Sequence, residues 1–256
     1  MSVDRPGEPD VTEQLVVHRR DVPQLTVHSW SRDGVMHSAW PGDGKQVPVD
    51  GTKIHLRIVA FPGGSVREIH LDKEARTHPH LSYEAVLFYQ IDGRRVQMVN
   101  ERSHELNPGD ACLQPTGVQH STFQLIGGLF VEFALPAPLL PDPEATWITA
   151  AEAGAPTVPS WFAAAGNAGS CTVRTFDLPG YPLHEIHLSR GSVMAPRREA
   201  LEQMFYVVKG SMNATLADTR ATVVTGDCMR CPPGRDFGFT ALDDTVFIHT
   251  AVPTSA

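Results

Sequence analysis

The chain has 256 residues, of which 41% are hydrophobic and 20% are charged. These values are typical of a soluble globular protein with one large or two ordinary domains, and they exclude a disordered chain. The 21 basic and 29 acidic residues give a net charge of -8. This charge argues against nucleic acid or an anionic membrane as a partner, because both attract a basic surface. Histidine is frequent, with 12 residues, and it is the commonest metal ligand and general base.

The sequence predicts a cytoplasmic protein without a membrane span. The first residues carry no apolar segment behind a basic cluster, as a signal peptide would. The longest apolar-rich stretch, residues 125–140, is interrupted by glycine, proline and glutamate and is shorter than a bilayer requires. Four cysteines in a chain of this length do not make a disulfide framework. Cys228 and Cys231 form a C-x-x-C pattern, but on a strand they would point to opposite faces, so we expect buried thiols.

Short strands separated by turns follow one another along the whole chain. Turn residues recur about every 8–12 residues, which is the spacing of sandwiches and barrels, and no segment keeps a 3.6-residue apolar period. We therefore predict an all-β fold with little helix. The predicted strands are 54–61, 85–91, 95–99, 111–114 and 129–133 in the first half, and 171–176, 204–208, 221–224 and 245–249 in the second.

The two halves of the sequence align on each other with a constant offset of 117 residues. The pattern G-D-x-x-x-x-P-x-G begins at Gly109 and again at Gly226. The turn at residues 92–94 corresponds in the same way to residues 209–211. A fixed offset over several anchors indicates two copies of one β domain. Between them lies a proline-rich connector, residues 135–143, whose composition predicts an extended and stiff segment.

The first copy contains residue types that bind metals. His78 and His80 are two residues apart, so on a strand their side chains leave the same face, and Glu84 keeps that parity if the strand continues. His120 follows the turn at residues 115–117 and begins a later strand. If the two strands are neighbours, three imidazoles and one carboxylate form a nitrogen and oxygen site with open positions for substrate or water. Glu84 either binds the metal or stands off it as a catalytic base.

These residues resemble the two-part signature of the cupin superfamily. Residues 78–84 match H-x-H-x(3–4)-E, and residues 109–120 match G-x(5)-P-x-G-x(2)-H. Two departures, Asp72 at the usual first glycine and a longer interval between Glu84 and Gly93, fall in loops, where length is tolerated.

The resemblance implies two tandem cupin-type β-barrels, each a double-stranded β-helix or jelly roll. It also implies one divalent transition metal per chain, with Fe(II) favoured and Mn, Ni, Co or Zn as alternatives. The implied metal ligands are His78, His80, Glu84 and His120.

The second copy keeps the frame of the first but lacks its ligands. Phe237 stands at the position of His120, and no histidine lies between His187 and His249. We therefore predict two domains. Residues 1–140 form an N-terminal arm with a metal-binding barrel, and residues 141–256 form a degenerate, metal-free barrel.

Two roles remain open for the second barrel. It either pairs with the first, as two subunits of a cupin dimer would, or it binds an anionic ligand through Arg197, Arg198 and Arg235. The first role makes the chain either a monomer that mimics a dimer or a homodimer.

Substrate contacts are expected close to the metal ligands. Arg57 and Arg67 lie on predicted strands and could meet an acidic substrate if their side chains face inward. His104 lies in a polar stretch that we interpret as an exposed turn. The candidate substrate contacts are Tyr83, Gln114, Thr122, Gln124 and Arg57.

Three functions fit these observations. The first is a metal-dependent cupin enzyme that acts on a small organic substrate, with dioxygenase-type oxidoreductase chemistry as the leading subclass. The second is a metal-dependent isomerase, cyclase or lyase that needs no redox step. The third is a small-molecule-binding or sensor protein without catalysis. The ligand types do not distinguish these functions, because a fold hosts many chemistries.

Overall fold

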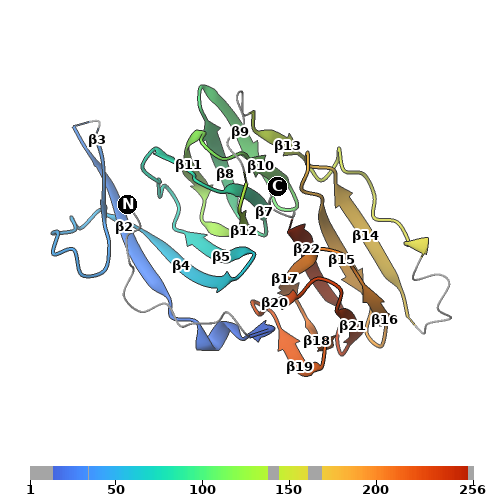
Figure 1. Cartoon of the computed structure of the whole chain (residues 1–256). Coiled ribbons are helices and arrows are strands. Elements are labelled where there is room, and N and C mark those ends of the chain that lie inside the picture. The colour runs from blue at the N-terminus through green and yellow to red at the C-terminus, as the bar shows by residue number, and fades with distance from the viewer. Residues whose placement is uncertain (1–13, 34, 138–143, 161–168, 253–256) are drawn as a thin grey trace.

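A computed structural model of the chain describes residues 14–33, 35–137, 144–160 and 169–252. These residues are almost entirely β structure, as the turn spacing predicts (Figure 1). A short 3₁₀ helix, η1 (Arg19–Asp21), precedes the first long strand. No helix within the described ranges has the length and apolar character needed to cross a bilayer. Most of the proline-rich connector lies outside the described residues.

The described strands assemble into antiparallel sheets, and each half of the chain contributes a large sheet and a four-stranded one. The strands of the first half are β1 (Val16–Val17), β2 (Leu25–Arg32), β3 (Val35–Ala39), β4 (Thr52–Phe61), β5 (Gly64–Leu71), β6 (His80–Leu81), β7 (Ala85–Gln90), β8 (Arg94–Val99), β9 (Arg102–Leu106), β10 (Ala111–Gln114), β11 (Gln119–Ile126) and β12 (Gly128–Leu135). The later strands are β13 (Thr146–Ile148), β14 (Cys171–Phe176), β15 (Leu183–Leu188), β16 (Val193–Arg198), β17 (Glu202–Lys209), β18 (Ser211–Leu216), β19 (Thr219–Val224), β20 (Cys228–Cys231), β21 (Asp236–Ala241) and β22 (Thr245–Val252).

The sheets of the two halves have the same strand order. The order β10-β7-β12-β5-β4 in the first half corresponds to β20-β17-β22-β15-β14 in the second, and β6-β11-β8-β9 corresponds to β16-β21-β18-β19. The glycine anchors of the repeat also match in conformation, with φ of +88° at Gly109 and +89° at Gly226. Because side chains disfavour this left-handed region, glycine is required at the same point of both copies. The domain boundary at residue 140 falls among residues that are not described, so it stays a prediction.

The central strands of each half are buried on both faces. All six residues of β7 are buried. Its inward side chains, such as Phe88, join the core of the first half, whereas its outward ones, such as Leu87, join a cluster shared with the second half. This explains the uninterrupted apolar run at residues 85–89, because a strand covered on both sides does not alternate. The two large sheets therefore pack with their outer faces against each other (Figure 1).

Each half also receives a short strand from the beginning of the other half. β1 is the first strand of the first half but pairs with β20, and β13 is the first strand of the second half but pairs with β10. Equivalent carboxylates fix both crossings. Asp227 accepts the backbone N–H of Arg19 at 2.8 Å, and Asp110 accepts that of Ala150 at 2.8 Å.

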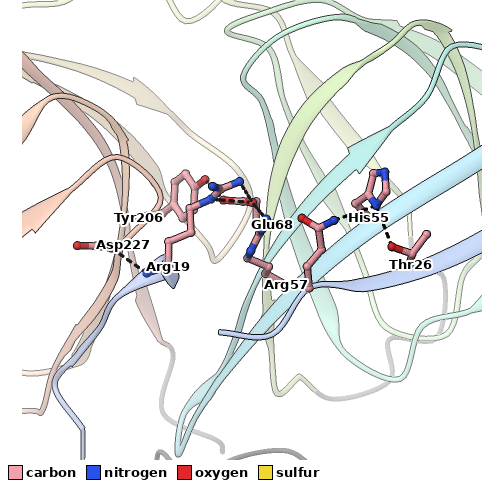
Figure 2. Close-up of polar contacts among 8 residues, drawn as sticks. Arg19, Thr26, His55, Arg57, Glu68, Tyr206 and Asp227 are labelled. Atoms are coloured by element: carbon pink, nitrogen blue, oxygen red, sulfur yellow. Dashed lines mark hydrogen bonds and ion pairs between the residues drawn. The ribbon is translucent and has the colours of Figure 1, made fainter. Parts of the chain in front are cut away.

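Two buried glutamates, related by the offset of 117, hold the interface between the large sheets. Glu68 accepts hydrogen bonds from Arg57 at 2.8 Å and, across the interface, from Tyr206 at 2.8 Å (Figure 2). Arg19 adds a bidentate contact at 2.7 Å (Figure 2). At the equivalent positions, Glu185 pairs with Arg174 at 3.1 Å and with Tyr89 and His187. Arg174 corresponds to Arg57 through the same offset, and Tyr89 corresponds to Tyr206.

We expect the Glu68→Gln substitution to lower the free energy of unfolding by about 2–4 kcal/mol. It removes the charge that compensates two arginines at a mostly buried position. Asp236→Asn is the matched control, since it breaks the exposed Arg198–Asp236 pair, where the expected loss is about 0–1 kcal/mol. Chemical denaturation of both variants measures the difference. Equal losses would contradict a structural role for Glu68.

The same carboxylates predict an acid-dependent stability. Burial raises the pKa of Glu68, but hydrogen bonds from Arg19 and Tyr206 outweigh this effect and leave the pKa below its ordinary value. The pKa of Glu185 is lowered in the same way, against burial, by hydrogen bonds from His187 and Tyr89. A carboxylate whose pKa is lowered on folding stabilises the protein above its unfolded pKa, and this stabilisation is lost as the pH falls through the folded pKa.

The free energy of unfolding should therefore fall on acidification below about pH 5, near and under the ordinary glutamate pKa of about 4.3. Denaturation curves between pH 7 and pH 3 measure the slope. The Glu68→Gln variant should show a shallower fall than the wild type, and parallel curves would refute this assignment.

Candidate metal and substrate cavity

A cavity of about 670 Å³ lies in the first half, lined by residues of both of its sheets. This volume is in the range of small-molecule sites. Val27 on β2 and Trp40 after β3 contribute to the lining, so the β2–β3 hairpin at the edge of the large sheet forms part of the wall. The other apolar lining residues include Ile54, Leu56, Ile69, Phe88 and Phe130.

All four predicted metal ligands line this cavity. His80 on β6 is the register partner of His120 on β11, and the centroids of their rings are 4.0 Å apart. Nδ1 of His80 lies 2.7 Å from the backbone oxygen of His78, and Nδ1 of His78 lies 2.9 Å from that of Pro79. Because a carbonyl oxygen only accepts, each Nδ1 carries the proton and each Nε2 keeps a lone pair. This orientation is common in metal-binding histidines.

The strand expected to carry His78, His80 and Glu84 is not continuous. The structure has the two-residue strand β6 (His80–Leu81), and His78 lies before it in an extended loop. His78 and His80 are exposed, whereas His120 is buried. Pro79 explains in part why the strand does not extend back to His78, because proline has no N–H to donate to a neighbouring strand.

Gln114 and His120 are in direct contact, with 2.6 Å between Nε2 of Gln114 and Nδ1 of His120. Burial, followed by the nearby His80, lowers the pKa of His120 to about 3. His120 is therefore neutral near pH 7. In this contact the Gln114 amide donates to Nδ1, which places the ring proton of the neutral imidazole on Nε2.

A buried chain of polar side chains supports this contact. Arg95 donates to Gln97 at 2.9 Å, and Gln97 donates to Gln114 at 3.1 Å. Because arginine has donors only, the oxygen of Gln97 must face it, and this sets the direction of the whole chain. Arg95 is fully buried and stacks on Phe130, with its guanidinium carbon 3.7 Å from the ring centroid. Burial lowers the pKa of Arg95 to about 10, so it remains charged.

Glu84 is engaged by an arginine of the same cavity. It forms an ion pair with Arg67, whose guanidinium also lies 3.8 Å from Glu132. Burial raises the pKa of Glu132, and the charges of Arg67 and Arg95 oppose that shift. Arg67 thus holds two carboxylates at the cavity wall. An anionic group entering the cavity would compete with them for this guanidinium.

The predicted ligands fit a divalent metal ion in donor type and, for His78 and His80, in the nitrogen they present. Their ligand atoms are not gathered. Among the described residues, the group of three or more ligand atoms within 4.8 Å of one another is His55, His70 and Asp72. To bind one ion, the exposed His78 would have to turn inward, His120 would have to give up its Nε2 proton, and Glu84 would have to leave Arg67.

The candidate substrate contacts divide into two groups. Tyr83 and Thr122 line the cavity. Gln114, Gln124 and Arg57 are not among the lining residues, although Gln114 contacts His120. Gln124 donates to the backbone of Ile126, at 2.5 Å, and Arg57 faces the other side of the sheet, where it binds Glu68.

Two further polar groups belong to this site, and the sequence signalled them only weakly. Glu132 is two residues from Phe130 on a predicted strand, so both side chains point to the same, inward face. A charged residue on an inward face was a sign of the site that the sequence itself contained. Arg95 lies on a predicted strand, but nothing in its neighbours indicated complete burial. His104, expected in an exposed turn, lies instead on β9 and stacks on Trp147.

In the second half, aromatic rings occupy the region that corresponds to the ligands. Phe237 contacts Phe205, with 5.3 Å between ring centroids, and Phe205 stacks on His249 at 4.7 Å. The three arginines considered as an anion site each pair with a carboxylate. The pairs are Arg197 with Glu199, Arg198 with Asp236 and Arg235 with Asp218.

No protein-family model matches the sequence, and no curated protein matches it. Solved structures do match. A variant of oxalate decarboxylase OxdC from Bacillus subtilis is 12% identical, with 97% of this chain and 80% of that chain covered and a TM-score of 0.67. AerE from Microcystis aeruginosa is 9% identical, with 82% and 96% covered and a TM-score of 0.68. A putative glyoxylate-induced protein from Pseudomonas aeruginosa is 14% identical, with 79% and 82% covered and a TM-score of 0.64.

These neighbours are cupin-fold proteins. At such low identity the likeness concerns the fold alone, and it confirms the all-β jelly-roll architecture predicted from the two motifs. The chain therefore has a cupin fold.

Proposed function

We propose that this chain is a metal-dependent cupin enzyme that transforms a small organic substrate in the cavity of the first half, with dioxygenase-type chemistry. The observation that supports it most is the meeting of His78, His80, Glu84 and His120 at one cavity with Arg67. Isolated histidines are common, but these three histidines and Glu84 lie at the spacings of two matching motifs and line one cavity of ligand size.

The four predicted ligands would hold one divalent ion, with Fe(II) favoured. Such an ion supplies a Lewis acid and a centre for O2 chemistry when bound. The chain's own contribution is to bind and orient the substrate. The apolar side chains of β4, β5 and β7 exclude water from its body, while Arg67 attracts an anionic or enolic oxygen.

Glu84 is the proposed proton acceptor. In the described structure its carboxylate is paired with Arg67. A substrate anion that binds Arg67 would replace this contact, so Glu84 would become free to take a proton from the substrate or to bind the metal. Substrate entry and activation of the base are thereby coupled through one guanidinium. Glu132, whose pKa is raised by burial, lies 3.8 Å from the same guanidinium.

A metal-dependent isomerase, cyclase or lyase is the second candidate. The observation in favour of a lyase is that a neighbour of the same fold is, by name, an oxalate decarboxylase. A third candidate, binding without catalysis, uses the same cavity. We also propose that the second half serves as the structural partner of the first and that the chain works as a pseudo-dimer, because the two large sheets bury their outer faces together.

Metal analysis of the purified chain tests the first part of the proposal. The His80→Ala/His120→Ala variant should bind one metal equivalent less than the wild type and remain folded, because the barrel has a core of its own. His37→Ala is the control, since His37 lies on the β2–β3 hairpin and stacks on Trp30. An unchanged metal content in the double variant would refute the cavity site.

Oxygen-electrode measurements on the Fe(II)-loaded protein test the reaction class. Oxygen uptake with enolic, phenolic or keto-acid substrates is expected, and it should fall at least about 100-fold in the Glu84→Gln variant if Glu84 is the base. Substrate turnover without oxygen uptake would overturn the dioxygenase assignment in favour of the lyase or isomerase. Tight binding without turnover of any compound in the panel would favour the sensor.

A further inference from the structure

We infer a second divalent-metal site on the outer face of the large sheet of the first half, formed by His55, His70 and Asp72. It shares no ligand with the cavity and is independent of the proposed reaction. His55 lies on β4, His70 lies on β5, and Asp72 directly follows β5. The ligand atoms of the three residues lie within 4.8 Å of one another.

The register of two strands brings the ligands together. His55 and His70 are directly opposite across the antiparallel β4–β5 pair, and their ring centroids are 5.9 Å apart. Asp72 is two residues beyond His70, so it emerges on the same face. Ligand atoms bound at about 2.1 Å to one ion lie at most about 4.2 Å apart. Small side-chain movements would therefore close the observed group around an ion.

Neighbouring groups hold two of the ligands in place. Nδ1 of His55 lies 3.0 Å from Oγ1 of Thr26 (Figure 2) and 3.0 Å from Nε2 of Gln24. Because the Gln24 amide donates to Nδ1, the ring proton is on Nε2, and a metal bound at Nε2 would displace this proton. One oxygen of Asp72 accepts the backbone N–H of Lys53 at 3.1 Å. Such contacts fix the orientation of a ligand, and losing one typically weakens metal binding 10- to 100-fold.

This site and the cavity lie on opposite faces of the same strands. Ile54 and Leu56, on either side of His55, line the cavity, and so does Ile69, next to His70. Because side chains alternate along a strand, His55 and His70 point away from the cavity. His70 is exposed and His55 is partly buried, so solvent or a further ligand can reach an ion from outside.

The chemistry of the group selects a class of metal. Two imidazoles and one carboxylate suit Zn(II), Co(II), Ni(II) or Cu(II), with coordination positions left open. The nearby positive charges repel a bound cation only weakly. The guanidinium of Arg57 is paired with Glu68, and Lys53 has an exposed side chain that can extend into solvent.

Metal binding at this site would affect the wall of the cavity through strand β2. Thr26, which contacts His55, is next to Val27, and Val27 lines the cavity. An ion would therefore join β4 and β5 directly and hold β2 through Thr26. Since an ion that binds only the folded chain stabilises it, the melting temperature should rise with metal concentration.

The test uses the metal-free full chain titrated with Zn(II) and, for spectra, Cu(II). The background variant is His80→Ala/His120→Ala, which disables the cavity site. In this background we expect one equivalent of bound metal, a Cu(II) electron paramagnetic resonance spectrum with two nitrogen ligands, and a metal-dependent rise in melting temperature. Adding His55→Ala/His70→Ala should abolish all three.

Two further variants make the result specific. Thr26→Val keeps all three ligands and should weaken Zn(II) binding about 10-fold. His37→Ala, on the neighbouring hairpin, should leave binding unchanged. Metal binding that persists without His55 and His70, or a background variant that binds no metal, would overturn the site. Either result leaves the cavity proposal untouched, because that proposal is measured by the difference between the wild type and His80→Ala/His120→Ala.

Discussion

The large sheet of each half is apolar on both faces, and this constraint organises the whole molecule. The large sheet of the first half packs one face on its own core, and its other face carries Leu87, Val131 and Phe133, which are buried against the second half. The second half presents the same kind of surface with Met204, Tyr206 and Ile248, and the two surfaces form one hydrophobic cluster. Burying such an area is favourable by about 25 cal/mol per Å² of apolar surface.

Apolar packing does not by itself fix how two sheets are oriented, and the polar groups of this interface supply that information. Glu68 and Glu185 are each bonded by an arginine of their own half and a tyrosine of the other. The two crossed strands repeat the same relation, since each half donates a strand to its partner. Both features are reciprocal, as contacts between subunits of a symmetric dimer are. They recur at equivalent positions in both halves, although the interiors of the halves differ.

The two halves have the same strand arrangement, but their interiors contain different side chains. In the first half, Arg95, Gln97 and Gln114 form a hydrogen-bonded chain that ends at His120. The corresponding positions of the second half are Met212, Ala214, Cys231 and Phe237, all apolar and buried. A buried polar chain stabilises a fold only if its members are bonded to one another, so it has to be replaced as a unit. The second half shows such a complete replacement, and these four side chains belong to its hydrophobic core.

How much the sequence determines is clear from particular residues. Turn spacing and apolar runs determined strands such as residues 111–114 and 171–176, because local backbone preference and burial leave their pattern in the chain itself. The resemblance of the two motifs predicted the jelly-roll fold that the structure shows, and His78, His80, Glu84 and His120 line one cavity, although their ligand atoms are not gathered. Only the tertiary structure decided that Arg67 faces the cavity whereas Arg57 faces the interface, that Arg67 pairs with Glu84, and that His55 meets His70. These facts depend on strand register and on contacts between distant segments, and a one-residue change of register reverses the face of every side chain.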